Sequence, residues 1–136
     1  MNPVLYILCR NDLASLNNGK MIAQACHAAN QMTKHALSWI DSKPIKEKQM
    51  YNALYNEWVE SADGFGTTIS LSMNEKEMRE SVNIANIIGL HAGITHDPSY
   101  PLLDGRTLHL IPLDTCAFVF GNKDDCWFLR QFPLVP

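Results

Sequence analysis

The chain has 136 residues, enough for one hydrophobic core and too few for two, so we expect a single domain over residues 1–136. Hydrophobic residues make up 46% of the sequence and charged residues 18%, which excludes an intrinsically disordered chain. The formal net charge of −3 argues against a broad surface for nucleic acid but leaves room for a small basic pocket.

The sequence also bears on location. No apolar run approaches the roughly 20 residues of a membrane-spanning helix, so we expect no membrane partner. The segment from Met1 to Leu8 lacks a basic leader and a cleavage site, which favours a first strand over a signal peptide. Three of the four cysteines lie in apolar runs typical of free buried thiols, and none forms a CxxC pair. Together these features predict a cytoplasmic protein with reduced cysteines.

The first two predicted elements lie at the N-terminus. Val4 to Cys9 is a continuous apolar, β-prone run of the kind that is buried on both faces of a sheet. A polar loop follows, and Asn18 is the expected N-cap of a helix that runs to about Trp39.

The remaining elements follow from periodicity and from turn signals. Pro44 precedes a helical pattern over 45–59, and Asn74 with Glu77 resembles a capping box for a helix that stops at Gly89. The other expected elements are a strand over 67–72, a short strand over 90–96, a proline-rich loop over 97–106, an extended segment over 107–111, a strand over 115–120 and a short helix over 124–131.

This β-α-α-β-α-β-β-α order predicts an α/β fold. We expect a three-layer single domain in which a mixed sheet of about four strands carries helices on both faces. The first three strands are expected to run parallel through right-handed crossovers.

One face of the first helix carries polar side chains at helical spacing. Its members recur at i, i+4, i+7, i+11 and i+14: Lys20, Gln24, His27, Gln31 and Lys34. The residues expected to pack on the other sides are Met21, Ile22, Ala25, Cys26, Ala29 and Met32. A cation, an amide and an imidazole near a helix N-terminus suit an anion or an ester. The wet face of an ordinary amphipathic helix is the alternative.

The carboxyl ends of the first and third strands mark one edge of the sheet, where ligands of such folds gather. Arg10 to Asp12 follow the first strand and Asp97 follows the third, so we expect Lys20, His27 and Asp97 to converge. Lys20 in the first helical turn would bind an anion, and His27 would act as a general base or as a hydrogen-bond donor to a phosphate. The alternatives are a solvated lysine, a structural histidine and a turn-capping aspartate.

Several other kinds of site are not expected. No histidine pair has the spacing of metal ligands, so we expect neither a metal site nor a cofactor. The sequence has no G-x-S-x-G elbow, and Gly19-Lys20 lacks the upstream glycine of a P-loop. A hydrolase with this sequence would therefore activate water directly.

The N-terminal residues resemble a family signature. Arg10-x-Asp12-Leu13 followed by Gly19-Lys20-x-x-Ala23-Gln24-x-x-His27-Ala28 is similar to the opening of the type-2 peptidyl-tRNA hydrolases, which carry R-x-D-L and then G-K-x-A-A-Q-x-x-H-A. The predicted order of elements matches that family over the whole chain. The motif itself covers residues 10 to 28.

The second half departs from the family pattern of D-A-G-x-T after the third strand and P-G-T-x-T at the fourth. Asp97 follows the strand here, but no Ala-Gly comes after it, and a longer loop precedes Thr115. We align Asp97 and Thr115 with the family residues, and Asp104 with Thr107 is the alternative pair. The departure leaves room for a diverged substrate or a lost activity.

The resemblance implies hydrolysis of the ester between a peptide, or an N-blocked amino acid, and the 3′ end of tRNA. Water would be the nucleophile and no metal would be needed. The catalytic residues it implies are Lys20, His27, Asp97 and Thr115, and the substrate-binding residues are Arg10, Asp12, Gly19 and Gln24. Lys20 would face a phosphate or the oxyanion, and His27 or Asp97 would position water. Arg10 and Asp12 would equally well form a structural ion pair.

Two other functions remain open at this point. The first is a non-catalytic module that binds RNA or protein through the same fold, which the altered segment from 97 to 114 favours. The second is a hydrolase of a related aminoacyl ester. An acidic tRNA-binding protein would contact only the acceptor end, or would form a homodimer that pools two small basic patches.

Overall fold

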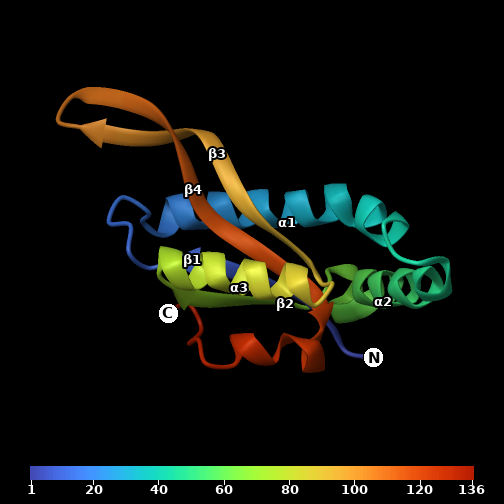
Figure 1. The fold of residues 1–136 in the computed structure, drawn as a ribbon. Helices are drawn as coiled ribbons and strands as arrows, with labels where there is room; N and C mark the ends of the chain where they lie inside the picture. Colours follow the sequence, from blue (N-terminus) through green and yellow to red (C-terminus); the bar gives the residue numbers. More distant parts are fainter.

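The computed structural model describes residues 1–136 and has a four-stranded sheet between two layers of helices (Figure 1). Its elements are, in chain order, β1 (Pro3–Arg10), α1 (Asn18–Asp41), α2 (Ile45–Gly64), β2 (Thr68–Met73), α3 (Glu75–Ile87), β3 (His91–Asp104), β4 (Thr107–Asn122) and the 3₁₀ helix η1 (Lys123–Leu129). This order confirms the predicted α/β arrangement. None of the helices combines the length and the apolar character that crossing a membrane requires.

The strands are ordered β2-β1-β4-β3 across the sheet. β1 pairs in parallel with β2, whereas β4 runs antiparallel to both β1 and β3. β1, β2 and β3 therefore point the same way, as predicted, and β3 forms an edge of the sheet. On the opposite side, backbone hydrogen bonds join Ser72 to Pro133 and Val135 to Ser70, so the C-terminal segment runs along the outer edge of β2.

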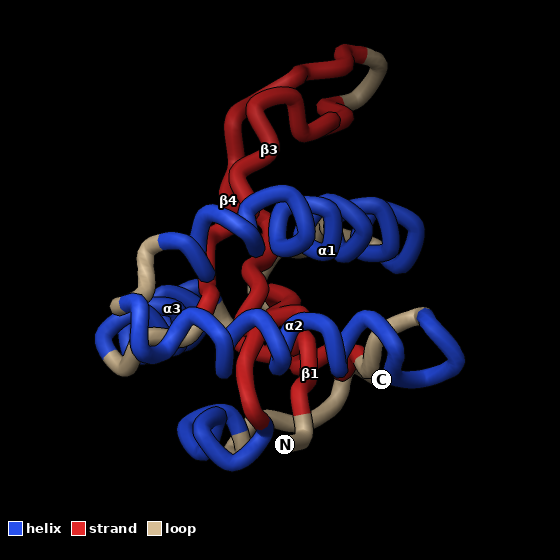
Figure 2. Tube along the Cα trace, turned by 90° about the vertical axis from the view of Figure 1, so that its right-hand side faces the viewer, coloured by secondary structure: helices blue, strands red, loops and turns tan.

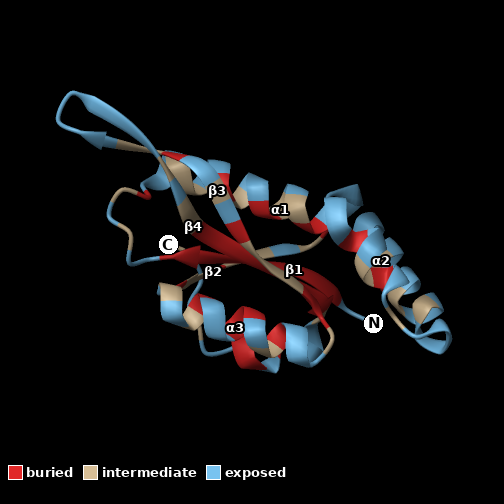
Figure 3. Cartoon of the chain, turned by 45° about the horizontal axis from the view of Figure 1, so that its top comes forward, coloured by how far each residue is buried: buried red, intermediate tan, exposed pale blue.

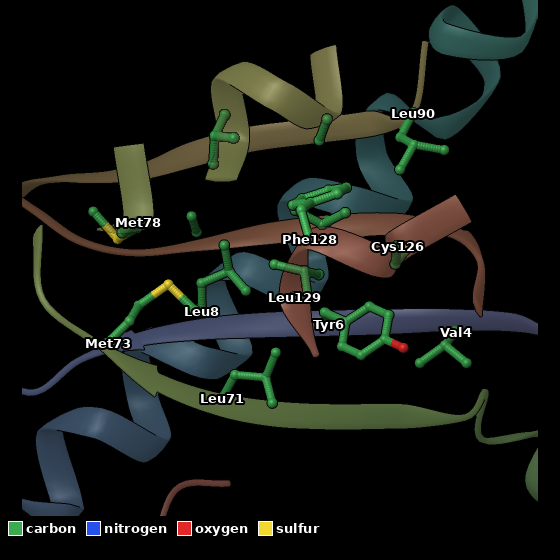
Figure 4. Close-up of a cluster of buried hydrophobic side chains, with 14 residues drawn as sticks. Val4, Tyr6, Leu8, Leu71, Met73, Met78, Leu90, Cys126, Phe128 and Leu129 are labelled. Carbon is green, nitrogen blue, oxygen red and sulfur yellow. The ribbon is translucent and has the colours of Figure 1, made fainter. Parts of the chain in front are cut away.

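β1 is buried along its whole length because both of its faces are covered. Leu5 and Ile7 pack in a cluster with α1 and α2, while Tyr6 and Leu8 pack in a second cluster with α3 and η1 (Figure 4). Fully burying a Leu or Ile side chain contributes about 1.5–3 kcal/mol. The continuous apolar pattern of this strand thus fixes it at the centre of the molecule and holds its carboxyl end in place.

The helix ends follow their capping signals. Asn74 and Glu77 form the predicted capping box of α3, with a hydrogen bond in each direction. For α1 the prediction was wrong by one residue: the N-cap is Asn17, whose side chain accepts from the backbone N–H of Lys20 at 3.1 Å. Asn18 is therefore the first residue of the helix.

The predicted packing face of α1 was partly wrong. The buried residues of this helix are Gln24, Ala28, Met32, Ala36 and Ile40. Ile22, expected to pack, is 67% exposed, and Cys26 is also exposed. The alanines explain the difference, since their small side chains let this face of the helix approach the sheet closely. Gln24 is carried into the interior on that face.

The expected loop over 97–106 was also wrong, because β3 continues to Asp104 and pairs with β4 as a long hairpin. We call residues 97–113 the arm; it projects past α1 in Figures 1 and 2. Asp104-Gly105 is a hairpin-turn signal, and Gly105 has the positive φ, +60°, that such turns require. Pro98 and Pro101 lie on an edge strand, where a missing N–H is tolerated, and Pro98 lies within a register shift.

The arm is exposed at its tip and buried at its root (Figure 3). Tyr100, at the root, is 0% exposed, and its hydroxyl shares a hydrogen bond of 3.0 Å with Ser15 in the β1–α1 loop. Leu103 and Leu108 face each other near the tip and are 65% and 60% exposed. Only the root of the arm is thus part of the packed domain.

Candidate functional site

A chain of hydrogen bonds joins α1 to β3 and β4 at the place where the arm begins. The Gln24 amide nitrogen donates to Asp97 Oδ2 at 2.7 Å, and the Gln24 amide oxygen accepts from the Thr115 hydroxyl at 2.6 Å. One amide side chain therefore links a carboxylate and a hydroxyl from two different strands. We call this arrangement the Gln24 bridge.

The Gln24 bridge is held rigidly from within the fold. Gln24 is 3% exposed and Thr115 is 0% exposed. The Cys116 thiol donates to the Gln24 backbone carbonyl at 3.2 Å, which ties the helix to β4 a second time. The other Asp97 oxygen accepts from the backbone N–H of Ser99 at 2.9 Å. Asp97 itself stays partly exposed, so it is the member of the bridge that can meet a ligand.

Lys20 lies one turn before Gln24 but does not contact Asp97. Its ammonium group donates to the backbone carbonyl of Pro101 at 2.6 Å and lies 5.0 Å from the centre of the Tyr100 ring. The arm root thus holds the lysine that the sequence places in the site. The carbonyl and the ring are both uncharged, so they leave the positive charge of Lys20 unneutralised.

His27 lies on the exposed side of α1, one turn after Gln24. It lines an open polar pocket of about 340 Å³ between α1 and β3, together with His96 on the strand. His96 directly precedes Asp97 in the chain, so this pocket adjoins the Gln24 bridge. Of the three residues expected to converge, Asp97 bonds to Gln24, which lies between Lys20 and His27 along α1, but neither Lys20 nor His27 forms a hydrogen bond or ion pair with Asp97.

Arg10 and Asp12 form a structural ion pair. The Arg10 guanidinium contacts Asp12 at 2.9 Å and Glu75 at 3.0 Å, and it also donates to the backbone carbonyl of Asp114 at 2.9 Å. Arg10 is 8% exposed. Burial works to raise the pKa of Asp12, but its bonds to Arg10 and to the Glu75 N–H outweigh this, so that pKa lies below its ordinary value.

A second charged cluster, which we did not predict from the sequence, lies beside the bridge. His96 Nδ1 contacts Asp114 Oδ1 at 2.7 Å, and Arg79 of α3 contacts the other oxygen of Asp114 at 2.6 Å. Burial acts to raise the pKa of Asp114, but the bonds from Arg79 and His96 outweigh it and hold that pKa below its usual range. The signal was present in the dipeptides His96-Asp97 and Asp114-Thr115, in which two polar side chains follow one another along a strand.

The three remaining predicted positions are less constrained. Asp104 and Thr107 pair with each other beside the hairpin turn, on the exposed tip of the arm. Asp97 and Thr115, in contrast, meet the same Gln24 side chain. Gly19 is exposed, and a Cβ there would come no closer than 3.7 Å to Asn17, so packing does not require glycine at this position.

The cysteines offer no activated nucleophile in the core. Cys9, Cys116 and Cys126 are buried and free, as predicted for three of the four cysteines. Burial raises the pKa of Cys9 and Cys126 to about 12 and that of Cys116 to about 11, so these thiols stay protonated at neutral pH. No group of three or more His, Cys, Asp or Glu side chains is arranged to hold a metal ion.

The chain matches the model of a known protein family. The family model of peptidyl-tRNA hydrolase PTH2 matches residues 3–119, from the start of β1 to a point near the end of β4. The matched span includes α1, the whole arm and every residue of the Gln24 bridge. No curated protein matches the chain.

Proposed function

Because the chain belongs to the peptidyl-tRNA hydrolase PTH2 family, we propose that it hydrolyses the ester that joins a peptide, or an N-blocked amino acid, to the 3′ end of tRNA. Water is the nucleophile in this proposal. The observation that carries it beyond the family is the Gln24 bridge, which fixes the partly exposed Asp97 carboxylate against the helix that also carries Lys20 and the exposed His27.

In this proposal Asp97 positions the water and takes its proton. Each Asp97 oxygen already accepts one protein hydrogen bond, from Gln24 and from the Ser99 N–H, which fixes the plane of the carboxylate. A carboxylate offers about four lone-pair sites, so acceptor capacity remains for a water molecule. A fixed acceptor is what general-base catalysis needs, since the proton must move along a defined direction.

Thr115 and Gln24 act through Asp97 and do not contact the substrate. Thr115 has no exposed surface, so a ligand as large as tRNA cannot reach its hydroxyl. By donating to the Gln24 oxygen it fixes the orientation of the amide, so that the NH₂ group faces Asp97. We therefore assign Thr115 and Gln24 as positioning residues, a narrower role than the family resemblance alone implied.

Lys20 supplies the positive charge of the site. Its hydrogen bond to the Pro101 carbonyl involves no countercharge, so a phosphate or a developing oxyanion competes well for the ammonium group. Lysine has a flexible stem, which lets the amine exchange one acceptor for another without movement of the helix. His27, on the following turn, is the alternative general base.

The test is hydrolysis of N-acetylaminoacyl-tRNA by the pure protein, with and without a chelator, followed as release of deacylated tRNA. Removing one group that stabilises an oxyanion typically costs about 100- to 1000-fold in rate. Lys20→Ala should lose activity by about this factor and keep the fold, because Lys20 is only partly buried. Lys46→Ala removes an exposed lysine of α2 and should behave as the unmodified protein.

Two results would contradict the proposal. Lys20→Ala with unreduced turnover would remove Lys20 from the mechanism. No hydrolysis by the unmodified protein, together with tight binding of deacylated tRNA, would favour the non-catalytic RNA-binding module. That second function has one observation in its favour, since the amine of Lys20 is already engaged by the arm.

A further inference from the structure

We propose that the pocket between α1 and β3 binds the phosphodiester backbone of the tRNA 3′ strand, a few nucleotides before the ester. This inference rests on the proposed function and adds the direction in which the tRNA 3′ strand runs across the protein. The 3′ terminal nucleotide lies at the Gln24 bridge, and the preceding nucleotides run along α1 toward Lys34.

The lining of the pocket is suited to an anion. Eight residues line it and one of them is hydrophobic; none is Asp or Glu. Four of the eight carry cationic or potentially cationic side chains: His27, Lys34, His35 and His96. Such a group is unusual on a protein with a net charge of −3, and it concentrates donors for phosphate oxygens in one place.

The walls of the pocket are held at a fixed spacing. Gln31 of α1 accepts from the Thr95 hydroxyl at 2.8 Å and donates to the Ile94 carbonyl at 3.0 Å, which joins the helix to β3 at the pocket floor. A Cβ at Gly93 would lie 3.3 Å from the Gln31 nitrogen and 3.1 Å from Phe118, so glycine permits this close approach. The pocket is therefore formed before any ligand arrives.

His96 is also fixed in place. Its Nδ1 contacts Asp114, which Arg79 holds from the other side, and Nε2 has no partner within the protein. A histidine held by a carboxylate in this way has a defined ring orientation. Lys34, in contrast, forms no ion pair and is exposed on the helix, so its ammonium group is available to a ligand.

The spacing along α1 favours an extended polyanion over a single phosphate. Lys20, His27 and Lys34 are separated by seven residues each, or two turns, and so lie on one side of the helix about 10 Å apart. From Asn18 to Ile40 the helix contains no Asp or Glu; its one acidic residue is Asp41 at the far end. A nucleic acid strand carries charges at regular intervals and matches such a row.

The geometry also gives a distance from the ester. Lys34 is ten residues past Gln24, which corresponds to about 15 Å along the helix. With phosphates spaced about 3.4 Å apart along a stacked strand, Lys34 meets the backbone about four nucleotides before the ester. Replacing Lys34 should therefore not change the hydrolysis of a substrate that lacks that part of the strand.

The experiment compares Lys34→Ala with Lys46→Ala in two assays. The first is binding of deacylated tRNA over a range of salt concentrations, which needs no hydrolysis. Lys34→Ala should weaken binding about tenfold at low salt, and the slope of log affinity against log salt should become shallower by about 0.7 for each lost phosphate contact. Lys46→Ala should change neither quantity.

The second assay measures hydrolysis of two esters. Lys34→Ala should lower kcat/KM for N-acetylaminoacyl-tRNA about tenfold and leave that for N-acetylaminoacyl-adenosine, which has no phosphodiester, unchanged. Equal effects on both esters, or a salt slope unaltered by Lys34→Ala, would overturn the inference. If Lys34→Ala makes the salt slope shallower as expected but the unmodified protein hydrolyses neither ester, only the proposed function is overturned. The pocket would then be the binding site of a non-catalytic module.

Discussion

At the scale of single residues, the site depends on one buried amide. Gln24 meets a carboxylate with its nitrogen and a hydroxyl with its oxygen, and no other type of side chain of this length offers a donor and an acceptor together. A glutamate would place a second carboxylate against Asp97. A methionine would remove both bonds and leave the fully buried Thr115 hydroxyl without its acceptor, a loss that costs about 1–3 kcal/mol.

The role of Thr115 can be tested with two substitutions. Thr115→Val keeps the shape of the side chain but removes the hydroxyl, which leaves the Gln24 oxygen unpaired. We expect its free energy of unfolding to fall by about 1–2 kcal/mol, and kcat to fall at an unchanged KM because Asp97 is no longer held. Thr115→Ser keeps the hydroxyl and should restore kcat. Urea unfolding and steady-state kinetics measure the two effects; a rise in KM at unchanged kcat would mean that Thr115 contacts the substrate.

The sequence identified the members of this site but not their partners. Lys20, Gln24 and His27 stood out because helical spacing places them on one side of α1. Spacing does not say which part of that side faces the sheet, however, since the answer depends on how closely the alanines pack. The Gln24–Thr115 bond joins a helix to a strand 91 residues later, and the His96–Asp114 pair joins two strands across 18 residues, so neither contact follows from the pattern within one element.

At the scale of elements, the arm is where the structure departs most from the elements that the sequence predicts. Its root is part of the domain, because Tyr100 is buried, bonds to Ser15 and lies beneath the amine of Lys20. Its tip carries exposed leucines on one face, at Leu103, Leu108 and Leu110. The root and the tip should therefore respond differently to mutation.

Tyr100→Ala should lower the free energy of unfolding by about 3 kcal/mol, as for other large buried aromatic side chains, and should also reduce hydrolysis because Lys20 loses its support. Tyr100→Phe removes only the hydrogen bond to Ser15 and should cost about 1 kcal/mol. Leu108→Ala, at the exposed tip, should change stability by less than about 0.5 kcal/mol. Chemical denaturation of the three variants measures these values, and a large effect of Leu108→Ala would show that the tip is packed.

The arm was misread in the sequence for a physical reason. Prolines and an Asp-Gly pair between 97 and 106 are typical of loops, but the same residues fit a hairpin when the prolines lie on an edge strand. Whether a strand is an edge strand follows from the topology of the whole sheet. In contrast, β1 and the capping box of α3 were predicted well, since their signals lie within one element.

At the scale of the whole molecule, one buried titratable group couples the packing of the two layers to pH. His91 is 6% exposed, contacts the Met32 carbonyl at 2.9 Å and stacks on Trp39. Burial lowers the pKa of His91; the bond to Met32 opposes this, and the nearby charges of His35 and Lys43 add to the lowering. The folded protein therefore keeps this imidazole neutral at pH values where the unfolded chain binds a proton.

The consequence is a loss of stability on acidification. The full contribution of neutral His91 is present above the unfolded pKa of about 6.5, and it decreases as the pH falls from there towards the lower folded pKa. His91→Gln, whose amide can still donate to the Met32 carbonyl, should remove this part of the pH dependence, even if the variant is less stable throughout. His109→Gln, which replaces a histidine on the exposed arm, should keep the dependence of the unmodified protein. Free energies of unfolding measured in urea between pH 7.5 and pH 5 test this, and parallel curves for the unmodified protein and His91→Gln would show that the fold does not depend on a neutral His91.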